Sequence, residues 1–191
     1  VPRPAYFGGA DLYRMELASS REEAVAKSRP DFNIAAYALG RSFLLLLAAD
    51  GKYGMNTDVD FYTLDYETLA VSPCAVYGES IGSSVGSDIR HGGGRTMKMD
   101  GDVLYFISTR FDSAGLYKLE NGVVSPVTER GGSVDCFDRC GEKMLLCALW
   151  DMRAQELYDE TGARITHFND AALRGKYVAR PEALTYTAED H

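Results

Sequence analysis

The sequence predicts an all-β fold, and two observations carry that prediction. Most of the 191 residues fall into short runs of β-branched, aromatic and leucine residues that Gly, Asn, Asp and Ser separate, which is a strand-and-turn pattern. Only one segment of some length has a helical pattern, at residues 20–27, where Ser20 and Glu23 have the spacing of a capping box. A second, shorter turn of helix is expected after Asp170.

Three stretches of the chain repeat one four-part unit. Each unit has an alternating strand, a tight turn with a glycine, a strongly apolar strand and, after a polar loop, a strand that contains tyrosine. The units cover residues 32–65, 95–120 and 133–160, and their turn glycines are Gly40, Gly101 and Gly141. Glycine suits such turns because it adopts a positive φ at little cost. An incomplete earlier copy lies at residues 12–16.

The repeated unit places the expected strands in order along the chain. The alternating strands are expected at 33–38, 96–99 and 134–137, the apolar strands at 43–48, 103–107 and 144–149, and the tyrosine-bearing strands at 61–65, 116–120 and 156–160. The longest apolar run, which ends at Asp50, is far shorter than the roughly 20 residues of a membrane-spanning helix. We therefore expect a buried strand there and no membrane association.

The spacing of the repeat favours a β-propeller. Gly101 and Gly141 are about 40 residues apart, the period of a four-stranded blade, and the longer interval before Gly101 contains a Gly/Ser-rich stretch. A β-sandwich also has regularly spaced strands, but it has no reason to repeat the same unit with its glycine in register. The sequence therefore predicts a partial β-propeller of roughly four blades built from four-stranded antiparallel sheets.

The predicted organisation follows the repeat along the chain. It comprises the end of a truncated blade (1–30), a blade (31–77), a Gly/Ser-rich loop (78–94), two further blades (95–132 and 133–170) and an exit segment (171–191).

The charge of the chain bears on whether it binds nucleic acid, and its cysteines bear on the cellular compartment. The formal net charge is -8, so a nucleic acid would have to bind against the overall field of the protein, and none is expected. The four cysteines form no C-x-x-C pair, and we expect them to pack as small apolar side chains in a reducing, cytoplasmic compartment. The first residue is Val1, so we expect the chain to be part of something longer.

Two motifs resemble parts of an esterase site, but their order argues against one. Residues 78–82 match the G-x-S-x-G nucleophile motif around Ser80, and residues 91–94 match the HGGG oxyanion loop that begins at His91. In an α/β-hydrolase the oxyanion loop precedes the nucleophile, whereas here it follows Ser80. The Gly/Ser-rich residues after Ser80 are also poor helix formers. We therefore predict no catalytic residue in this chain.

The patterns that resemble metal and nucleotide sites each lack a residue that such a site requires. Asn56, Asp58 and Asp60 alternate like the start of a calcium loop, but Phe61 stands where the turn glycine is needed. The cysteines lack the spacing of a zinc site, and each Gly-Lys pair is followed by tyrosine in place of the hydroxyl residue of a P-loop. No metal and no cofactor is predicted.

Several stretches resemble the β-propeller of the prolyl oligopeptidase family of serine peptidases, in its acylaminoacyl-peptidase-like branch. Residues 87–95 and 99–106 resemble a loop and the first strands of a mid-propeller blade, and residues 116–119 resemble the strand that follows. Residues 177–190 resemble the stretch that leaves the last blades and enters the hydrolase domain. The chain departs from the family in size, since about 40 residues per blade leave room for only four to five blades.

The resemblance implies a non-catalytic role. In that family the catalytic Ser, Asp and His belong to a C-terminal α/β-hydrolase domain, and the propeller covers the active site, restricts entry to short peptides and contributes contacts to the substrate. This chain would then gate the access of a short peptide to a hydrolase domain of the same parent chain. The alternative is a stand-alone propeller that binds a protein or a glycan.

The long loop at 78–94 is the expected place for substrate contacts, because long ordered loops on such scaffolds are where binding residues tend to lie. Asp88 offers a carboxylate for a peptide amine, and Arg90 and Arg95 offer guanidinium groups for a carboxylate or carbonyl. A local pair between Asp88 and Arg90 that only fixes the loop is the alternative. A partial ring also leaves unpaired strand edges, so we expect a homo-oligomer formed through the open ends.

Overall fold

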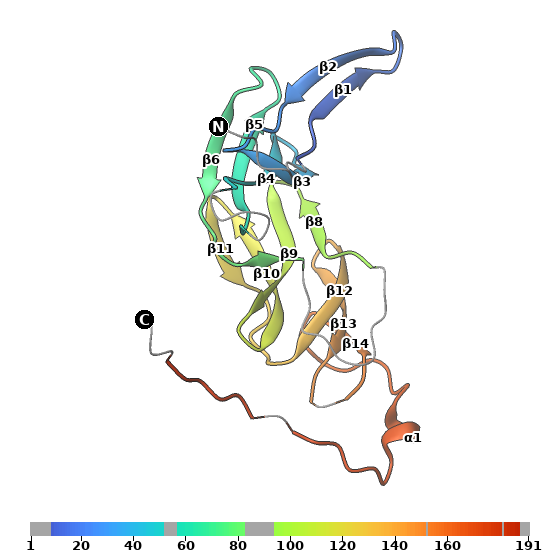
Figure 1. Cartoon of the computed structure of the whole chain (residues 1–191). Helices are drawn as coiled ribbons and strands as arrows, with labels where there is room; N and C mark the ends of the chain where they lie inside the picture. The colour runs from blue at the N-terminus through green and yellow to red at the C-terminus, as the bar shows by residue number, and fades with distance from the viewer. Residues whose placement is uncertain (1–8, 52–56, 83–93, 152, 181, 188–191) are drawn as a thin grey trace.

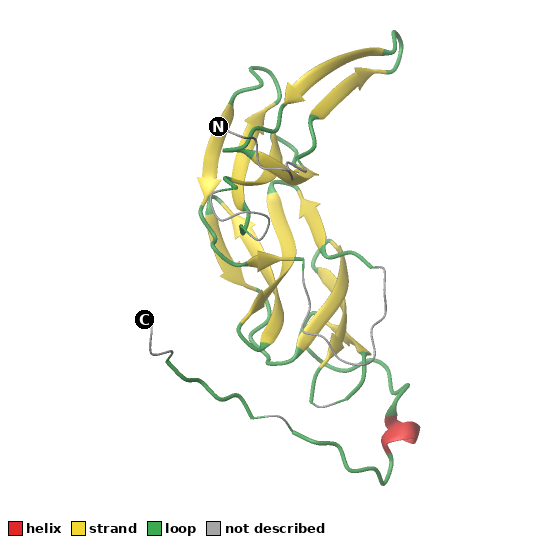
Figure 2. Ribbon diagram, in the orientation of Figure 1, coloured by secondary structure: helices red, strands yellow, loops and turns green. Residues whose placement is uncertain are grey.

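The computed structural model describes residues 9–51, 57–82, 94–151, 153–180 and 182–187. It is nearly all β: 52% of the described residues are in strands and 2% are helical. Successive antiparallel sheets follow one another along a curved body, with the β1–β2 hairpin at one end and α1 at the other (Figures 1 and 2). The predicted all-β, propeller-like fold is confirmed.

The elements follow the order of the repeated unit, and most of the expected strands lie within one to three residues of their predicted bounds. They are β1 (Leu12–Glu16), β2 (Arg21–Ala26), β3 (Asn33–Leu39), β4 (Phe43–Ala49), β5 (Asp60–Asp65), β6 (Val71–Ala75), β7 (Ser80–Ile81), β8 (Met97–Asp100), β9 (Val103–Arg110), β10 (Ser113–Glu120), β11 (Val123–Pro126), β12 (Ser133–Cys140), β13 (Lys143–Leu149), β14 (Glu156–Asp159) and the short helix α1 (Asp170–Leu173).

The strands form sheets by pairing with their neighbours in sequence. β3, β4, β5 and β6 make one four-stranded antiparallel sheet. β8, β9, β10 and β11 make a second, to which β7 adds at the end of β9. β12, β13 and β14 make a third, which is joined to the second by a single parallel bridge between Ala114 and Ser133. The inner strands β3, β8 and β12 lie along one side of the arc, and β6 and β11 along the other (Figure 1).

The prediction of a helix at residues 20–27 is wrong, because Arg21–Ala26 form strand β2, which pairs antiparallel with β1. A helix of two turns has too few internal hydrogen bonds to be stable alone. In the hairpin, the same residues gain a full set of strand pairs, and Arg14 lies opposite Glu23, to which its Nη2 donates a hydrogen bond of 2.8 Å. The short helix expected after Asp170 is present as α1.

The core consists of layers between successive sheets, because the apolar strands β4 and β9 are buried on both faces, whereas β13, in the last sheet, is buried on one. In β9, Leu104 and Phe106 pack toward the β3–β6 sheet, whereas Tyr105 and Ile107 pack toward β12–β14. The apolar strand β4 divides in the same way between the β8–β11 sheet and the first hairpin. Because side chains alternate across a strand, a continuous apolar run such as 43–49 requires a neighbouring layer on each side.

The turn glycines have two different physical reasons. Gly101 and Gly141 have φ values of 62° and 59°, as the sequence predicts. The prediction of a positive φ is wrong for Gly40, which lies outside that region. A Cβ there would meet the Phe43 carbonyl oxygen of the same turn at 2.7 Å and Asp102 Oδ1 of the next sheet at 3.0 Å, so Gly40 is required chiefly by the close approach of its own hairpin backbone.

Polar contacts connect the turns of adjacent sheets. The Asp102 carboxylate, beside the β8–β9 turn, accepts hydrogen bonds from the backbone N–H of Ser42 at 2.9 Å and from its hydroxyl at 2.7 Å. These bonds hold the pKa of Asp102 below its ordinary value. The next pair of sheets is joined by Lys98 and Arg139, which donate to Asp138 (2.6 Å) and Asp100 (2.8 Å), respectively. Polar contacts near the turns therefore join each of these two pairs of adjacent sheets, although the residues that make them differ.

Candidate functional site

Arg95 is the one predicted substrate-contacting residue that lies within the described part of the chain; Asp88 and Arg90 lie outside it. Arg95 precedes β8, its carbonyl oxygen accepts a hydrogen bond from the Phe137 N–H at 3.0 Å, and its side chain is half exposed. Its Nη1 lies 3.4 Å from Asp138 Oδ1, but Lys98 is the closer partner of that carboxylate at 2.6 Å. The Arg95 guanidinium therefore retains donors that face solvent.

The structure places Ser80, from the G-x-S-x-G motif, in a strand. Ser80 lies in the two-residue strand β7, antiparallel to the end of β9, and its carbonyl oxygen accepts a hydrogen bond from the Ser108 hydroxyl at 2.8 Å. Residues 91–93 of the HGGG motif lie outside the described residues. The helix α1 is the only helix in the described ranges, and it lies far along the chain from Ser80.

Two arginines that the sequence did not single out, Arg110 and Arg130, stack on aromatic rings. The Arg110 guanidinium, at the end of β9, lies 5.2 Å from the Tyr77 ring centroid and 5.0 Å from that of Tyr117. The Arg130 guanidinium lies 4.9 Å from the Trp150 ring and 5.7 Å from the Tyr158 ring. Such cation–π contacts hold a long side chain in one place.

The two stacked arginines share a cavity of about 310 Å³, which is also lined by Thr128 and Glu129. Arg110 Nε lies 3.7 Å from Glu79 Oε1, and Arg130 is paired with Asp151. Each guanidinium already faces one carboxylate, and Glu129 adds a further negative charge. The cavity is therefore a rigid polar surface with no excess of positive charge.

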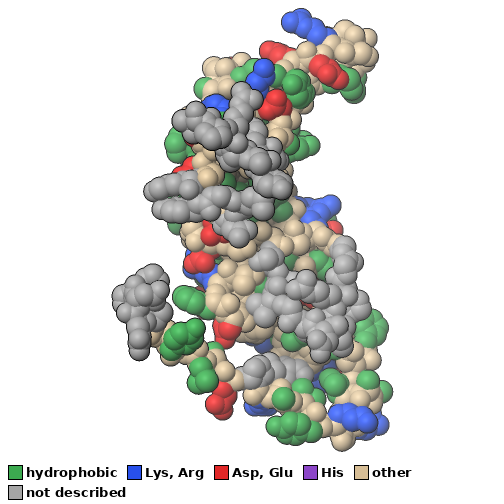
Figure 3. Space-filling view, in the orientation of Figure 1, with side chains coloured by type: hydrophobic (Ala, Val, Ile, Leu, Met, Phe, Trp, Pro, Cys, Tyr) green, Lys and Arg blue, Asp and Glu red, His purple; other side chains and the backbone are tan. Residues whose placement is uncertain are grey.

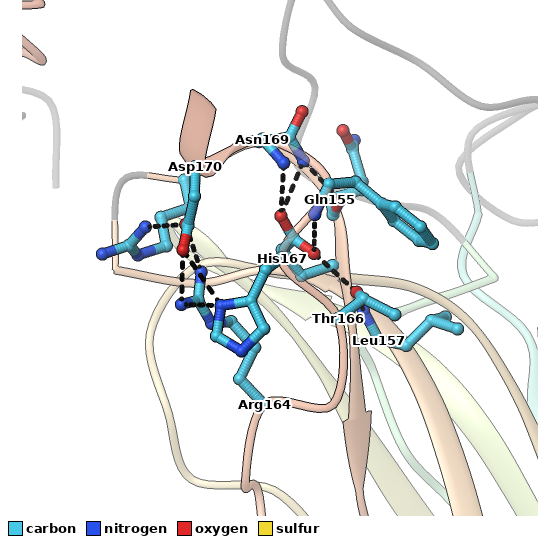
Figure 4. Close-up of polar contacts among 10 residues, drawn as sticks. Gln155, Leu157, Arg164, Thr166, His167, Asn169 and Asp170 are labelled. Carbon is cyan, nitrogen blue, oxygen red and sulfur yellow. Dashed lines mark hydrogen bonds and ion pairs between the residues drawn. The ribbon is translucent and has the colours of Figure 1, made fainter. Parts of the chain in front are cut away.

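A buried carboxylate organises the chain after the last strand. Glu156, at the start of β14, is 1% exposed and accepts hydrogen bonds from the Thr166 hydroxyl (2.5 Å), from the backbone N–H groups of Asn169 (2.8 Å) and Phe168 (3.1 Å), and from the Asn169 side chain (3.0 Å). Figure 4 shows Thr166 and Asn169 converging there. Burial raises the pKa of Glu156, but these bonds outweigh it and lower the pKa from 4.5 to about 2.

Asp170 forms a second cluster beside it, at the start of α1. Its carboxylate accepts hydrogen bonds from Arg164 (2.7 Å) and Arg153 (2.6 Å), and its Oδ2 lies 2.9 Å from His167 Nδ1 (Figure 4). The bonds from Arg164 and then His167 hold the pKa of Asp170 far below its ordinary value. The two carboxylates fix the chain at residues 164–170, directly before the exit segment.

A cavity of about 440 Å³ lies between this cluster and the exit segment. It is lined by Asp151, Arg153, Asp170, Arg174 and Arg180, among others. The residues that line it come from the loop between β13 and β14, from α1 and from the extended chain that follows α1 and runs away from the body in Figure 1.

The other patterns considered in the sequence have structural uses. Asp60, from the calcium-like pattern, accepts a hydrogen bond from the Tyr77 N–H at 2.9 Å. Within the ranges described above, no group of three His, Cys, Asp or Glu side chains is placed to hold a metal ion.

The expectation of buried cysteines is wrong for Cys140, which is exposed because it ends strand β12, and the other three are half-buried.

Charged side chains of both signs lie on the surface. The face in Figure 3 carries acidic and basic side chains interspersed along its described part. Among the described residues, no helix has the length and apolar character needed to cross a membrane.

Successive sheets that pack face to face, with repeated contacts between their turns, define a β-propeller-like protein. No family model and no curated protein sequence matches this chain. Solved structures do, and they include β-propellers of prolyl oligopeptidase-family peptidases, which confirms the resemblance at the level of the fold.

Three solved structures illustrate the likeness. The β-propeller domain of the trilobed protease from Pyrococcus furiosus has 20% identity and a TM-score of 0.62 over 87% of this chain and 46% of its own. The acylaminoacyl peptidase of Pyrococcus horikoshii has 18% identity and a TM-score of 0.70 over 98% of this chain and 28% of its own. A puromycin hydrolase has 17% identity and a TM-score of 0.55 over 90% and 26%. The chain thus spans less than half the length of each.

Proposed function

We propose that this chain is a non-catalytic propeller region of a serine peptidase of the prolyl oligopeptidase or acylaminoacyl-peptidase type. In this role it gates the access of short peptides to an α/β-hydrolase domain of the same parent protein, in the cytoplasm. The observation that carries the proposal is the likeness to the Pyrococcus horikoshii acylaminoacyl peptidase over 98% of the chain. A likeness of that extent includes most of residues 171–187, which follow the last sheet and are not part of any blade.

The anchoring of the exit segment supports this role. The carboxylates of Glu156 and Asp170 accept several hydrogen bonds from residues 164–170 and so hold this part of the chain in place. A loose linker would have needed no such cluster.

Arg95, with Asp88 and Arg90 of the same loop, is proposed to contact the peptide. Arg95 is suited to a peptide carbonyl or carboxylate because its side chain is half exposed while Lys98 holds the Asp138 carboxylate. Its backbone is also fixed by the bond from Phe137, so no backbone ordering is needed when the side chain engages a ligand.

The test is peptide binding combined with labelling by a fluorophosphonate probe. We expect short peptides to bind the chain, Arg95→Ala to weaken binding by about tenfold, the worth of one charge-assisted hydrogen bond, and the probe to leave the chain unlabelled. Arg14→Ala is the matched control, since Arg14 lies in the first hairpin and pairs with Glu23. Binding of glycans or folded proteins in place of peptides would favour the stand-alone propeller, and labelling of Ser80 would overturn the non-catalytic role.

We further propose that the open end of the arc pairs with a second copy. The first hairpin presents Tyr13 and Met15, which are 54% and 52% exposed, and Leu17 at its tip is 86% exposed. Large apolar side chains gathered on a terminal hairpin are typical of an interface. We expect light scattering to give a dimer that Met15→Glu converts to a monomer; a chain that is strictly monomeric before substitution would contradict the pairing.

A further inference from the structure

Two cysteines lie directly opposite each other in the last sheet. Cys136 of β12 is the strand partner of Cys147 of β13, next to a register shift between Val134 and Cys136. Opposed residues of antiparallel strands have Cα atoms about 4.5–5.5 Å apart, within the range of about 4.4–6.8 Å that disulfides span. The backbone therefore already brings the two thiols within reach of a covalent bond.

The surroundings of Cys147 disfavour its thiolate. Both side chains are half-buried. Burial, and then the adjacent Cys136, raise the pKa of Cys147 from 9.0 to about 11. Cys147 therefore stays a thiol at neutral pH, whereas thiol–disulfide exchange requires a thiolate.

We propose that Cys136 and Cys147 are a redox modification site, at which a low-molecular-weight disulfide such as oxidised glutathione produces a reversible cross-strand disulfide. The Cys136 thiolate attacks a sulfur of oxidised glutathione, the S–S bond breaks, and one glutathione leaves as a thiolate. Cys147 then loses its proton and attacks the Cys136 sulfur of the mixed disulfide, which releases the second glutathione. Two cysteine thiols are oxidised and one glutathione disulfide is reduced to two thiols.

The site is mechanically connected to the start of β8. A Cβ on Gly94 would lie 2.6 Å from Cys136 Cβ and 2.8 Å from its Sγ, so residue 94 packs directly on this side chain. The next residue, Arg95, is tied to β12 by the bond from the Phe137 N–H. Moving the Cys136 sulfur toward Cys147 changes its contact with Gly94. The position of the next residue, Arg95, therefore changes as well. The proposal does not depend on the peptidase role.

The experiment is oxidation of the chain by oxidised glutathione, followed by intact mass and peptide mapping. Cys74→Ser/Cys140→Ser removes the other two thiols, so in this variant we expect more than half of the chains to lose two hydrogen atoms. The linked peptides should contain Cys136 and Cys147. We also expect dithiothreitol to reverse the change, and hydrogen exchange at the Phe137 amide to differ between the two states.

The single variant Cys147→Ser separates this site from nonspecific oxidation. With the resolving thiol gone, Cys136 should stop at the mixed disulfide and gain the mass of one glutathione. The proposal is overturned if the wild-type chain, mapped directly, carries glutathione on both cysteines, leaves both thiols free, or links Cys136 to Cys140.

Discussion

Replacing Phe106 with alanine is expected to lower the free energy of unfolding by about 3–5 kcal/mol, the usual cost of removing a buried aromatic side chain. Phe106 is fully buried in β9, and its ring lies 5.3 Å from Phe61 and 5.5 Å from Tyr77, centroid to centroid. Phe61 belongs to the preceding sheet, so the substitution opens a cavity between two sheets. Denaturant unfolding measures the loss.

The matched control is Phe111, the residue that directly follows β9. Its side chain is 100% exposed, so Phe111→Ala should change stability by less than about 0.5 kcal/mol. Equal losses at the two positions would contradict the layered core.

Replacing Glu156 with glutamine is expected to cost about 2–3 kcal/mol, because a buried, charged acceptor of several hydrogen bonds becomes a neutral group with one acceptor atom. The effect should depend on pH. The pKa of Glu156 is lowered in the folded state, so its stabilisation is present above the ordinary value of 4.5 and is lost as pH falls toward about 2. That shift corresponds to roughly 3 kcal/mol.

The measurement is urea unfolding between pH 5 and pH 2 for both proteins. The wild-type chain should lose more stability over this window than Glu156→Gln, and the two should converge at the acid end. Glu160→Gln is the control, since Glu160 lies near Glu156 but pairs at the surface with Lys143. A constant difference between wild type and Glu156→Gln across the window would show that the carboxylate is not the stabilising group.

The strands were predictable because their signal is local and repeated. Continuous apolar runs such as 43–49 require burial on both faces, and the structure supplies a sheet on each side. The failure at residues 20–27 has a clear physical cause. The capping-box pattern describes only the local chain, whereas β1 supplies strand partners that a short helix cannot match.

The polar positions were harder to predict, because their function depends on distant partners. Gly40 carries the same turn signal as Gly101, yet it has no positive φ, and glycine is needed there because the Phe43 carbonyl oxygen approaches closely. Glu156 looks like an exposed residue of a strand, and its burial follows from the return of residues 166–169 over it. Arg110 and Arg130 gave no motif at all, since the rings on which they stack come from different strands.

The central claim is that successive sheets pack face to face, and a double-mutant cycle between Phe61 and Phe106 tests it most directly. With leucine at either or both positions, we predict a coupling energy of about 0.5–1.5 kcal/mol, as for other aromatic pairs in contact. Phe61→Leu combined with Trp150→Phe, two sheets away, should be additive. Additive losses for Phe61 and Phe106 would mean that their sheets do not meet and would contradict the propeller arrangement.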